Sequence, residues 1–258
     1  MKKEQQLTAT QLACNMKCVH VTAAEKFYQF VWNKVIIHLE DFDGMMELIG
    51  IIGKLVSASG FEDVLYQADL CTSGGINGVL SGKHYNRSWA VHECLSEALY
   101  RLFVEKEEEQ FQMSEDLVDL IKGSKSNEKC KRLVESDEFC KLHEKFKGVR
   151  DEYLNGNRGK TAQFWMMYLN LVELQERFHY LINVNDFTFR LECWKKIIQL
   201  CFPTNKKNYG AYYVRVLENL EKTHSGAIEE LSQNGISVRR NDSFGQSIDG
   251  AGEQTTFM

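Results

Sequence analysis

Apolar residues recur at helical spacing along most of the chain, and this pattern predicts a mainly helical protein. The clearest helix is predicted over residues 161–182, where apolar side chains return every three or four positions. A second is predicted over 83–110, with Leu102 on its apolar face and a solvated, acidic end. Further helices are predicted over 136–154 and 187–201, and the chain's one proline, Pro203, follows the last of these.

The apolar stretch over residues 34–40 predicts the best strand in the chain. It leads directly into Asp41 and Asp43, and a helix pattern follows from Met45, so Asp43 is predicted to be the N-cap of that helix. One or two short strands are expected in all, and the predicted fold class is a mainly α, multi-helix domain. The predicted organisation is a poorly ordered N-terminus over 1–21, a helical domain over 22–234, and a flexible, truncated tail over 235–258.

Composition and charge narrow the range of functions. The chain has 258 residues and a formal net charge of -5, so it lacks the basic excess typical of proteins that bind phosphate backbones. No apolar run of about 18 residues occurs, and no membrane span or membrane partner is expected. No signal peptide is recognised, so the eight cysteines are expected to be reduced thiols of an intracellular protein, in the nucleus or the cytoplasm.

The carboxylates of Asp41 and Asp43 have two interpretations. An acid at the end of a strand can bind Mg²⁺ together with a second acid, and the metal can then activate a water or a hydroxyl group. Asp43 close by and Glu253 near the C-terminus are the candidate partners of Asp41 in that case. In the other interpretation the acids cap a helix and occupy a solvated turn, and composition favours this second interpretation.

The stretch "GKHYNRSWAVHE", residues 82–93, makes the start of a predicted helix basic and aromatic. Tyr85, Arg87, Trp89 and His92 could form a contact surface for a protein partner, since exposed aromatic patches often mark interfaces. Packing of Trp89 in the core beside exposed histidines is the favoured alternative.

Two further motifs lack the parts that their chemistry needs. The segment "GNRGKTAQFW", residues 156–165, resembles a phosphate-binding loop, but Leu154 stands where that loop needs glycine, and a helix precedes it instead of a strand. Glu176 and His179 form a Glu-x-x-His pair, but di-metal helical bundles need a second such pair, which the chain lacks.

Three long segments carry a resemblance to a known group of proteins. The segments "HLEDFDGMMELIGIIGKLVSASGFEDVLYQADL", "GKTAQFWMMYLNLVELQERFHYLINVNDF" and "YGAYYVRVLENLEKTH" resemble parts of uncharacterised animal proteins that come from mobile genetic elements. The resemblance covers roughly residues 30–258. Such proteins look like remote relatives of RNase-H-like DDE transposases that carry a large helical insertion.

The resemblance implies roles for two acids. Asp41 matches the second catalytic position of the transposases, although the glycine and histidine usual on either side are replaced, and Glu253 in "GEQT" matches the late catalytic glutamate. The first strand with its acid is missing before residue 30, and the usual continuation after "GEQT" is absent. Two-metal chemistry needs a full set of carboxylates. The resemblance therefore implies an inactive remnant, a fragment of an RNase-H-like α/β core with its helical insertion.

The leading hypothesis is therefore a transposon-derived helical protein without catalytic activity and without a cofactor. One rival is a residual nuclease or transposase that uses Asp41 and Glu253 with Mg²⁺, for which the resemblance implies a nucleic-acid partner. The other rival is a helical module that binds protein through Tyr85, Arg87, Trp89 and His92.

Overall fold

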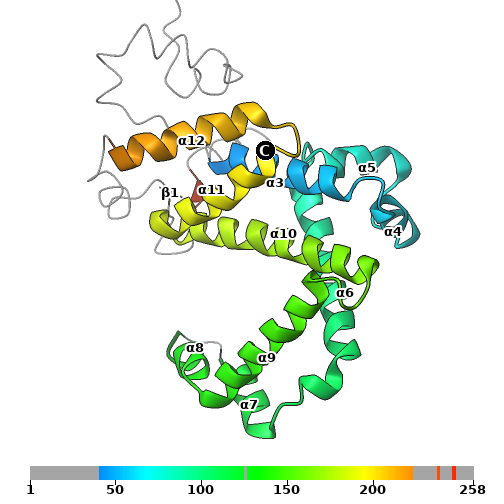
Figure 1. Cartoon of the computed structure of the whole chain (residues 1–258), viewed down its shortest axis with the longest axis vertical. Coiled ribbons are helices and arrows are strands. Elements are labelled where there is room, and N and C mark those ends of the chain that lie inside the picture. Colours follow the sequence, from blue (N-terminus) through cyan, green and yellow to red (C-terminus); the bar gives the residue numbers. More distant parts are fainter. Residues whose placement is uncertain (1–40, 125–126, 223–236, 239–245, 248–258) are drawn as a thin grey trace, which may run out of the picture. The chain divides into compact units, whose positions relative to one another are not determined.

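The described part of the chain is mainly helical, as the sequence predicts (Figure 1). The computed structural model describes residues 41–124, 127–222, 237–238 and 246–247. In chain order the helices are α3 (Asp41–Val56), α4 (Phe61–Gln67), α5 (Ser73–Leu80), α6 (Tyr85–Lys106), the 3₁₀ helix η1 (Glu108–Gln110), α7 (Glu115–Gly123), α8 (Asn127–Val134), α9 (Asp137–Leu154), α10 (Lys160–Asn183), α11 (Phe187–Cys201) and α12 (Lys207–Lys222).

Strands are minor in the described residues. β1 (Ser237–Val238) pairs antiparallel with β2 (Gln246–Ser247), with Ser237 opposite Ser247. The strand predicted over 34–40 lies outside the described residues, as do the predicted N-terminus over 1–21 and most of the predicted tail.

Several helices are preceded by a short polar residue whose side chain caps the first turn. Ser114 before α7 accepts a hydrogen bond from the backbone N–H of Leu117, and Ser136 before α9 accepts one from Phe139, each at 3.1 Å. The carboxylate of Asp186 accepts one from the backbone N–H of Phe189 at the start of α11. Each cap satisfies an amide that would otherwise lack a partner at the helix start, which is typically worth about 1 kcal/mol.

The described residues form two compact units. The N/C unit contains the described residues up to Trp89 and from Glu173 onward, and the central unit contains Ala90–Val172. The division falls inside two continuous helices, α6 and α10, each of which contributes residues to both units. No loop or linker therefore marks the boundary in the sequence.

The N/C unit packs α3 against α5 and α11, and α11 against α12 (Figure 1). Glycines on α3 permit these close approaches. A Cβ at Gly53 would overlap the backbone of Leu80 in α5, and one at Gly44 would overlap the indole ring of Trp194 on α11. Larger side chains at either position would force the helices apart, so these glycines serve packing and not helix propensity.

The central unit has a smaller core that is rich in aromatic rings. Phe103 of α6 meets Tyr153 of α9 and Phe146 edge to face, with ring centroids 5.0 Å and 5.4 Å apart. Phe111, Val149, Met166 and Leu169 complete the buried cluster. Edge-to-face contacts between aromatic rings add about 1 kcal/mol to their burial, so this core depends on the geometry of a few large side chains.

Two details of the predicted helices are wrong. Asp43 is not an N-cap, because α3 already begins at Asp41 and includes Asp43 in its first turn. Leu102 is 60% exposed, while its neighbour Phe103 is 5% exposed, since the buried face of α6 follows Leu95, Leu99 and Phe103 at four-residue spacing. Within the described residues, no helix is long and apolar enough to cross a membrane.

Candidate functional site

Asp41, the acid that the sequence singles out, is buried within the N/C unit. The residue is 4% exposed, and its Oδ2 accepts a hydrogen bond from Nη1 of Arg190 at 2.7 Å. Arg190 lies on α11 and is 0% exposed. The two residues are 149 positions apart in the chain, so their pairing comes from tertiary packing alone.

Arg190 is buried beside an aromatic ring and two carboxylates. Its guanidinium lies over the ring of Phe187, 5.2 Å from the ring centroid. Burial lowers the pKa of Arg190, and the charges of Asp41 and Asp186 oppose that shift by raising it. Arginine nevertheless keeps its proton in proteins, so the pair remains a true ion pair. Nε and Nη2 of Arg190 have no hydrogen-bond partner among the described residues.

A stacked aromatic pair lies close to the buried acid. The rings of Trp194 and Tyr213 are 3.5 Å apart between centroids and inclined by 25°. The pKa of Tyr213 is raised well above 10, first by burial and then by the charge of Asp41. The hydroxyl group of Tyr213 therefore stays protonated at neutral pH and cannot serve as a general base.

This geometry does not suit Asp41 as a ligand of Mg²⁺. A metal ion at this carboxylate would have to compete with a guanidinium that already binds it at 2.7 Å. In the described part of the chain, no group of at least three His, Cys, Asp or Glu side chains is placed to hold a metal. Glu253, the other predicted catalytic acid, lies outside the described residues. A metal site at Asp41 and Asp43, and the catalytic pair with Glu253, stay predictions.

Four half-buried rings form a row across three helices of the N/C unit. Phe42 of α3 contacts Tyr85 with ring centroids 4.8 Å apart, Tyr85 is 6.3 Å from Trp89 on the same helix α6, and Trp89 is 4.6 Å from His179 of α10. Burial raises the pKa of Tyr85 to about 12. Arg87 is exposed on the same helix, but its guanidinium turns toward Leu70, whose carbonyl oxygen accepts from Nη2 at 3.5 Å. Of the predicted interaction residues, the structure thus brings Tyr85 and Trp89 together in the row and does not place Arg87 in it.

His92 does not join this row on the surface. It belongs to the central unit, is 0% exposed, and its Nδ1 lies 2.9 Å from the hydroxyl oxygen of Tyr168. Burial lowers the pKa of His92 to about 4, so the imidazole is neutral at physiological pH. The expectation of an exposed histidine here is wrong, because His92 follows Ser88 by one helical turn on the buried face of α6.

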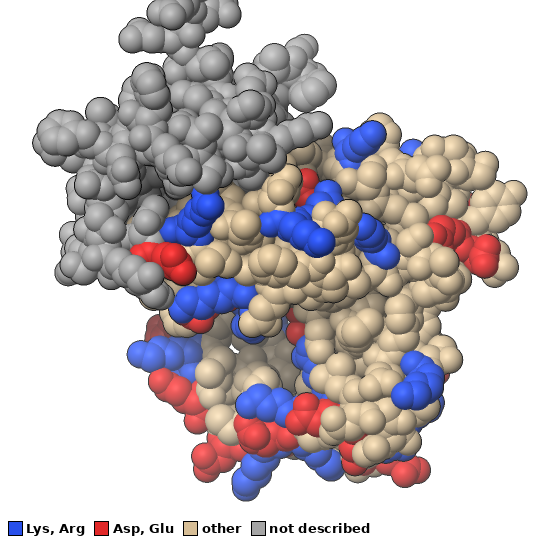
Figure 2. All heavy atoms as spheres, turned by 45° about the horizontal axis from the view of Figure 1, so that its top comes forward, with Lys and Arg blue, Asp and Glu red and all other residues tan. Residues whose placement is uncertain are grey.

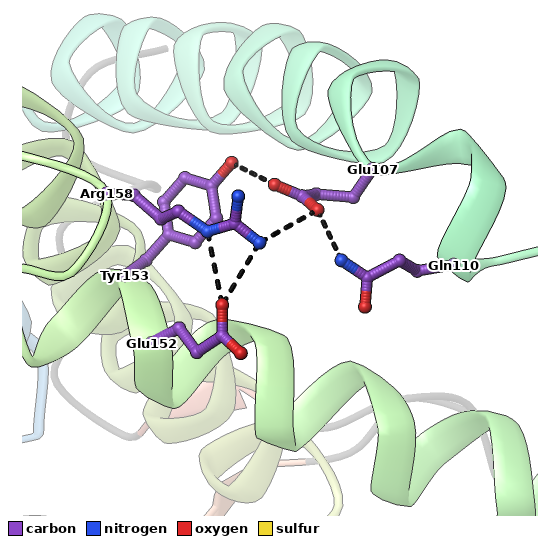
Figure 3. Close-up of polar contacts among 5 residues, drawn as sticks. All are labelled: Glu107, Gln110, Glu152, Tyr153 and Arg158. Atoms are coloured by element: carbon purple, nitrogen blue, oxygen red, sulfur yellow. Dashed lines mark hydrogen bonds and ion pairs between the residues drawn. The ribbon is translucent and has the colours of Figure 1, made fainter.

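A polar network that the sequence did not reveal lies in the central unit (Figure 3). Its centre is Glu107, which is 6% exposed and follows the last residue of α6. The hydroxyl group of Tyr153 donates to Oε1 of Glu107 at 2.7 Å, and the side chain of Gln110 donates to Oε2 at 2.7 Å. Arg158 reaches Oε2 at 3.5 Å and forms a second ion pair with Glu152 at 3.0 Å.

The network joins the end of α6 to α9 and to the loop before α10. The pKa of Tyr153 is raised to about 12 by burial and by the carboxylate of Glu107, so the phenol keeps its proton and acts as a hydrogen-bond donor. Arg158 also lies over the ring of Tyr153, 5.9 Å from its centroid. Because both carboxylate oxygens of Glu107 are engaged by donors, the arrangement holds structure and offers no open general base.

Glu107 stands in an acidic run that is typical of a solvated helix end, so the run itself does not predict its burial. The four-residue spacing from Leu99 and Phe103 is the signal that places Glu107 on the buried face. An acid at that spacing beside an aromatic core requires donors, and the sequence alone does not show that Tyr153 and Arg158 supply them.

The fold and these sites define a mainly helical protein in which the described polar clusters hold helices together. The chain belongs to a protein family described as Domain of unknown function (DUF8702), whose pattern matches residues 4–256. No curated protein and no solved structure matches the chain.

Proposed function

We propose that this chain is a helical protein derived from a mobile genetic element that has no catalytic activity. The observation that carries the proposal is the state of Asp41, which is 4% exposed and bound to Arg190 at 2.7 Å. A catalytic acid must reach a metal ion or a substrate, whereas this carboxylate faces a buried cation. The proposed origin rests on the resemblance of the segment around Asp41 to proteins from mobile genetic elements. In this proposal the helices correspond to the helical insertion of an RNase-H-like transposase core. The proposal places the chain inside the cell, in the nucleus or the cytoplasm.

A cleavage assay tests this proposal. Purified chain is incubated with supercoiled plasmid and Mg²⁺ or Mn²⁺, beside the same reaction with a chelator. The expected result is no metal-dependent nicking. Glu253→Gln is the matched variant for catalysis, because Asp41→Ala would break a buried ion pair and confuse lost activity with lost folding. Metal-dependent nicking that disappears in Glu253→Gln would overturn the proposal and support the nuclease alternative.

A second candidate function is the binding of a protein partner through the aromatic row. The supporting observation is that Phe42, Tyr85, Trp89 and His179 are half-buried rings, each in contact with the next along the row. Aromatic side chains contribute much of the binding energy of many interfaces.

Binding at this row is tested by affinity capture with the tagged chain. The wild-type chain is compared with Trp89→Ala, which changes the row, and with a matched control, Tyr66→Ala, which changes a 61% exposed aromatic on α4 of the same unit. We expect Trp89→Ala to lose a captured protein that the wild type and the control keep. Equal capture by all three proteins would remove the row from consideration.

A further inference from the structure

The outer face of α11 carries a phenylalanine and two lysines, and a second exposed phenylalanine directly follows the helix. The exposed positions of this face are Thr188, Phe189, Glu192, Lys195, Lys196 and Gln199. Phe189 is 62% exposed, and Phe202 after the helix end is 48% exposed. We call the exposed surface of Phe189, Lys195, Lys196 and Phe202 the α11 stripe.

The stripe lies in a basic part of the chain. Between Phe187 and Arg215 the sequence contains a single acid, Glu192, and that carboxylate pairs with Lys195 at 2.7 Å. Among the described residues no ion pair is found for Lys196, and both Lys196 and Arg177 act electrostatically on Cys193. Figure 2 shows several lysine and arginine side chains among mostly uncharged residues in the upper described part of its view.

A surface of the opposite character lies on the central unit. An open hollow of about 550 Å³ follows one face of α6 as far as η1 and is lined by Glu97, Tyr100, Arg101, Val104, Glu105 and Glu108. Tyr100 is half-buried and Val104 is 42% exposed, so they give the hollow an apolar floor. Arg101 pairs with Glu97 at 2.5 Å, which leaves the charges of Glu105 and Glu108 in excess.

We propose that the α11 stripe of one copy of this chain docks into the α6 hollow of a second copy. The two surfaces complement each other in apolar character and in charge. The stripe offers exposed phenyl rings flanked by lysines, and the hollow offers an apolar floor flanked by glutamates. This inference stands on the charges and exposures of the two surfaces and does not depend on the proposed function.

The geometry of the contact determines what kind of assembly follows. Different surfaces meet on the two copies, so the contact is heterologous, and each copy keeps one free stripe or one free hollow unless the rotation closes a ring. The average size of the assembly should therefore grow with protein concentration, and it should continue past a dimer wherever the contact does not close a ring. Since exposed charges supply the complementarity, salt should weaken it.

Sedimentation velocity of the full chain tests the proposal. At low salt the weight-average sedimentation coefficient should rise with protein concentration, and high salt should return it to the monomer value. Two charge reversals, Lys195→Glu with Lys196→Glu and Glu105→Lys with Glu108→Lys, should each abolish the rise. A mixture of the two variants should regain it, because the acidic hollow of the first variant meets the basic stripe of the second.

Two aromatic variants distinguish the proposed contact from non-specific hydrophobic association. Phe189→Ser should reduce self-association, and Tyr66→Ser, at a 61% exposed ring elsewhere in the same unit, should leave it unchanged. Far-UV circular dichroism establishes that each variant keeps the helical fold. A wild-type chain that stays monomeric at all concentrations at low salt would overturn the proposal, even if it bound an acidic protein or a nucleic acid instead. So would a mixture of the charge-reversed variants that stays monomeric.

Discussion

The two units use buried charge in different ways. In the N/C unit, Arg190 and Asp41 are 0% and 4% exposed and pair inside the core. In the central unit, Glu107 is 6% exposed, but the side chain of Arg158, its cationic partner, is 36% exposed and also pairs with Glu152 at the surface. We call the first arrangement the closed pair because both of its charges are buried, whereas the second is a network that reaches solvent.

The difference between the units has an energetic consequence. A charge that loses its partner in a closed apolar core has no water to replace it, so the loss costs several kcal/mol. In the network around Glu107, several donors share one carboxylate and water can reach the cation, so the loss of one donor costs less. Stability should therefore depend on single residues far more in the N/C unit than in the central unit.

The largest effect is expected for Arg190→Met. This change leaves the carboxylate of Asp41 buried without its cation, and we expect the free energy of unfolding of the N/C unit to fall by about 3–5 kcal/mol. The double variant Asp41→Leu with Arg190→Met removes both charges and should recover most of that loss. Urea unfolding with hydrogen exchange read residue by residue separates the two units and measures both values.

The double variant decides whether the pair behaves as a closed one. If it is as unstable as Arg190→Met alone, the cost lies in the shape of the arginine side chain and not in an orphaned charge. The contrast between the units would then fail.

A smaller effect is expected from acid on the central unit. The pKa of His92 is lowered from 6.5 to about 4 by burial, so between these values the unfolded chain binds a proton that the folded chain does not. The contribution of neutral, buried His92 to the free energy of unfolding is therefore fully present well above pH 6.5, and it is lost as the pH falls from 6.5 toward 4. At pH 5 the free energy of unfolding should be lower by about 2 kcal/mol than at neutral pH.

The variant His92→Gln isolates this contribution. Glutamine can still form a hydrogen bond with Tyr168 but does not titrate. The pH dependence of unfolding, measured for both proteins, should therefore be steeper in the wild type, and the exchange of amides near His92 in α6 should show it first. Identical slopes would mean that His92 is not buried as a neutral group.

The smallest effect is expected for Tyr153→Phe. This change removes the donor to Oε1 of Glu107 and leaves Gln110 and Arg158 on Oε2. We expect a loss of about 1.5 kcal/mol in the central unit, measured by urea unfolding. Arg101→Ala, which breaks an exposed pair with Glu97, is the matched control and should change the stability by less than about 0.5 kcal/mol. A loss of several kcal/mol on Tyr153→Phe would make the central network equivalent to the closed pair.

Helix positions were largely predictable from the sequence, because a buried face leaves a period of three to four residues. The pattern over 161–182 predicts α10, and the pattern over 136–154 predicts α9 within a residue of its ends. Finer details were not predictable. Whether Leu102 or Phe103 turns inward depends on which elements cover α6, since both residues are apolar.

The candidate sites were less predictable from the sequence than the helices. The sequence drew attention to Asp41, but the partner that defines its state, Arg190, has no signal in an apolar helix pattern 149 residues away. Tyr85 and Trp89 were correctly grouped as neighbours on one helix, while their contacts with Phe42 and His179 come from other helices. Local spacing predicts neighbours on one element, and it contains no information on which elements meet.

The amino-acid sequence by itself determined the net charge of -5 and a mainly helical chain. The helix pattern, like the caps that the structure shows at Ser114, Ser136 and Asp186, depends on residues within a few positions of one another. Only the tertiary structure decided that Asp41 and Glu107 are buried and which cations they face. The physical reason is desolvation: the state of a carboxylate depends on whether water or another helix surrounds it, and that is a property of packing.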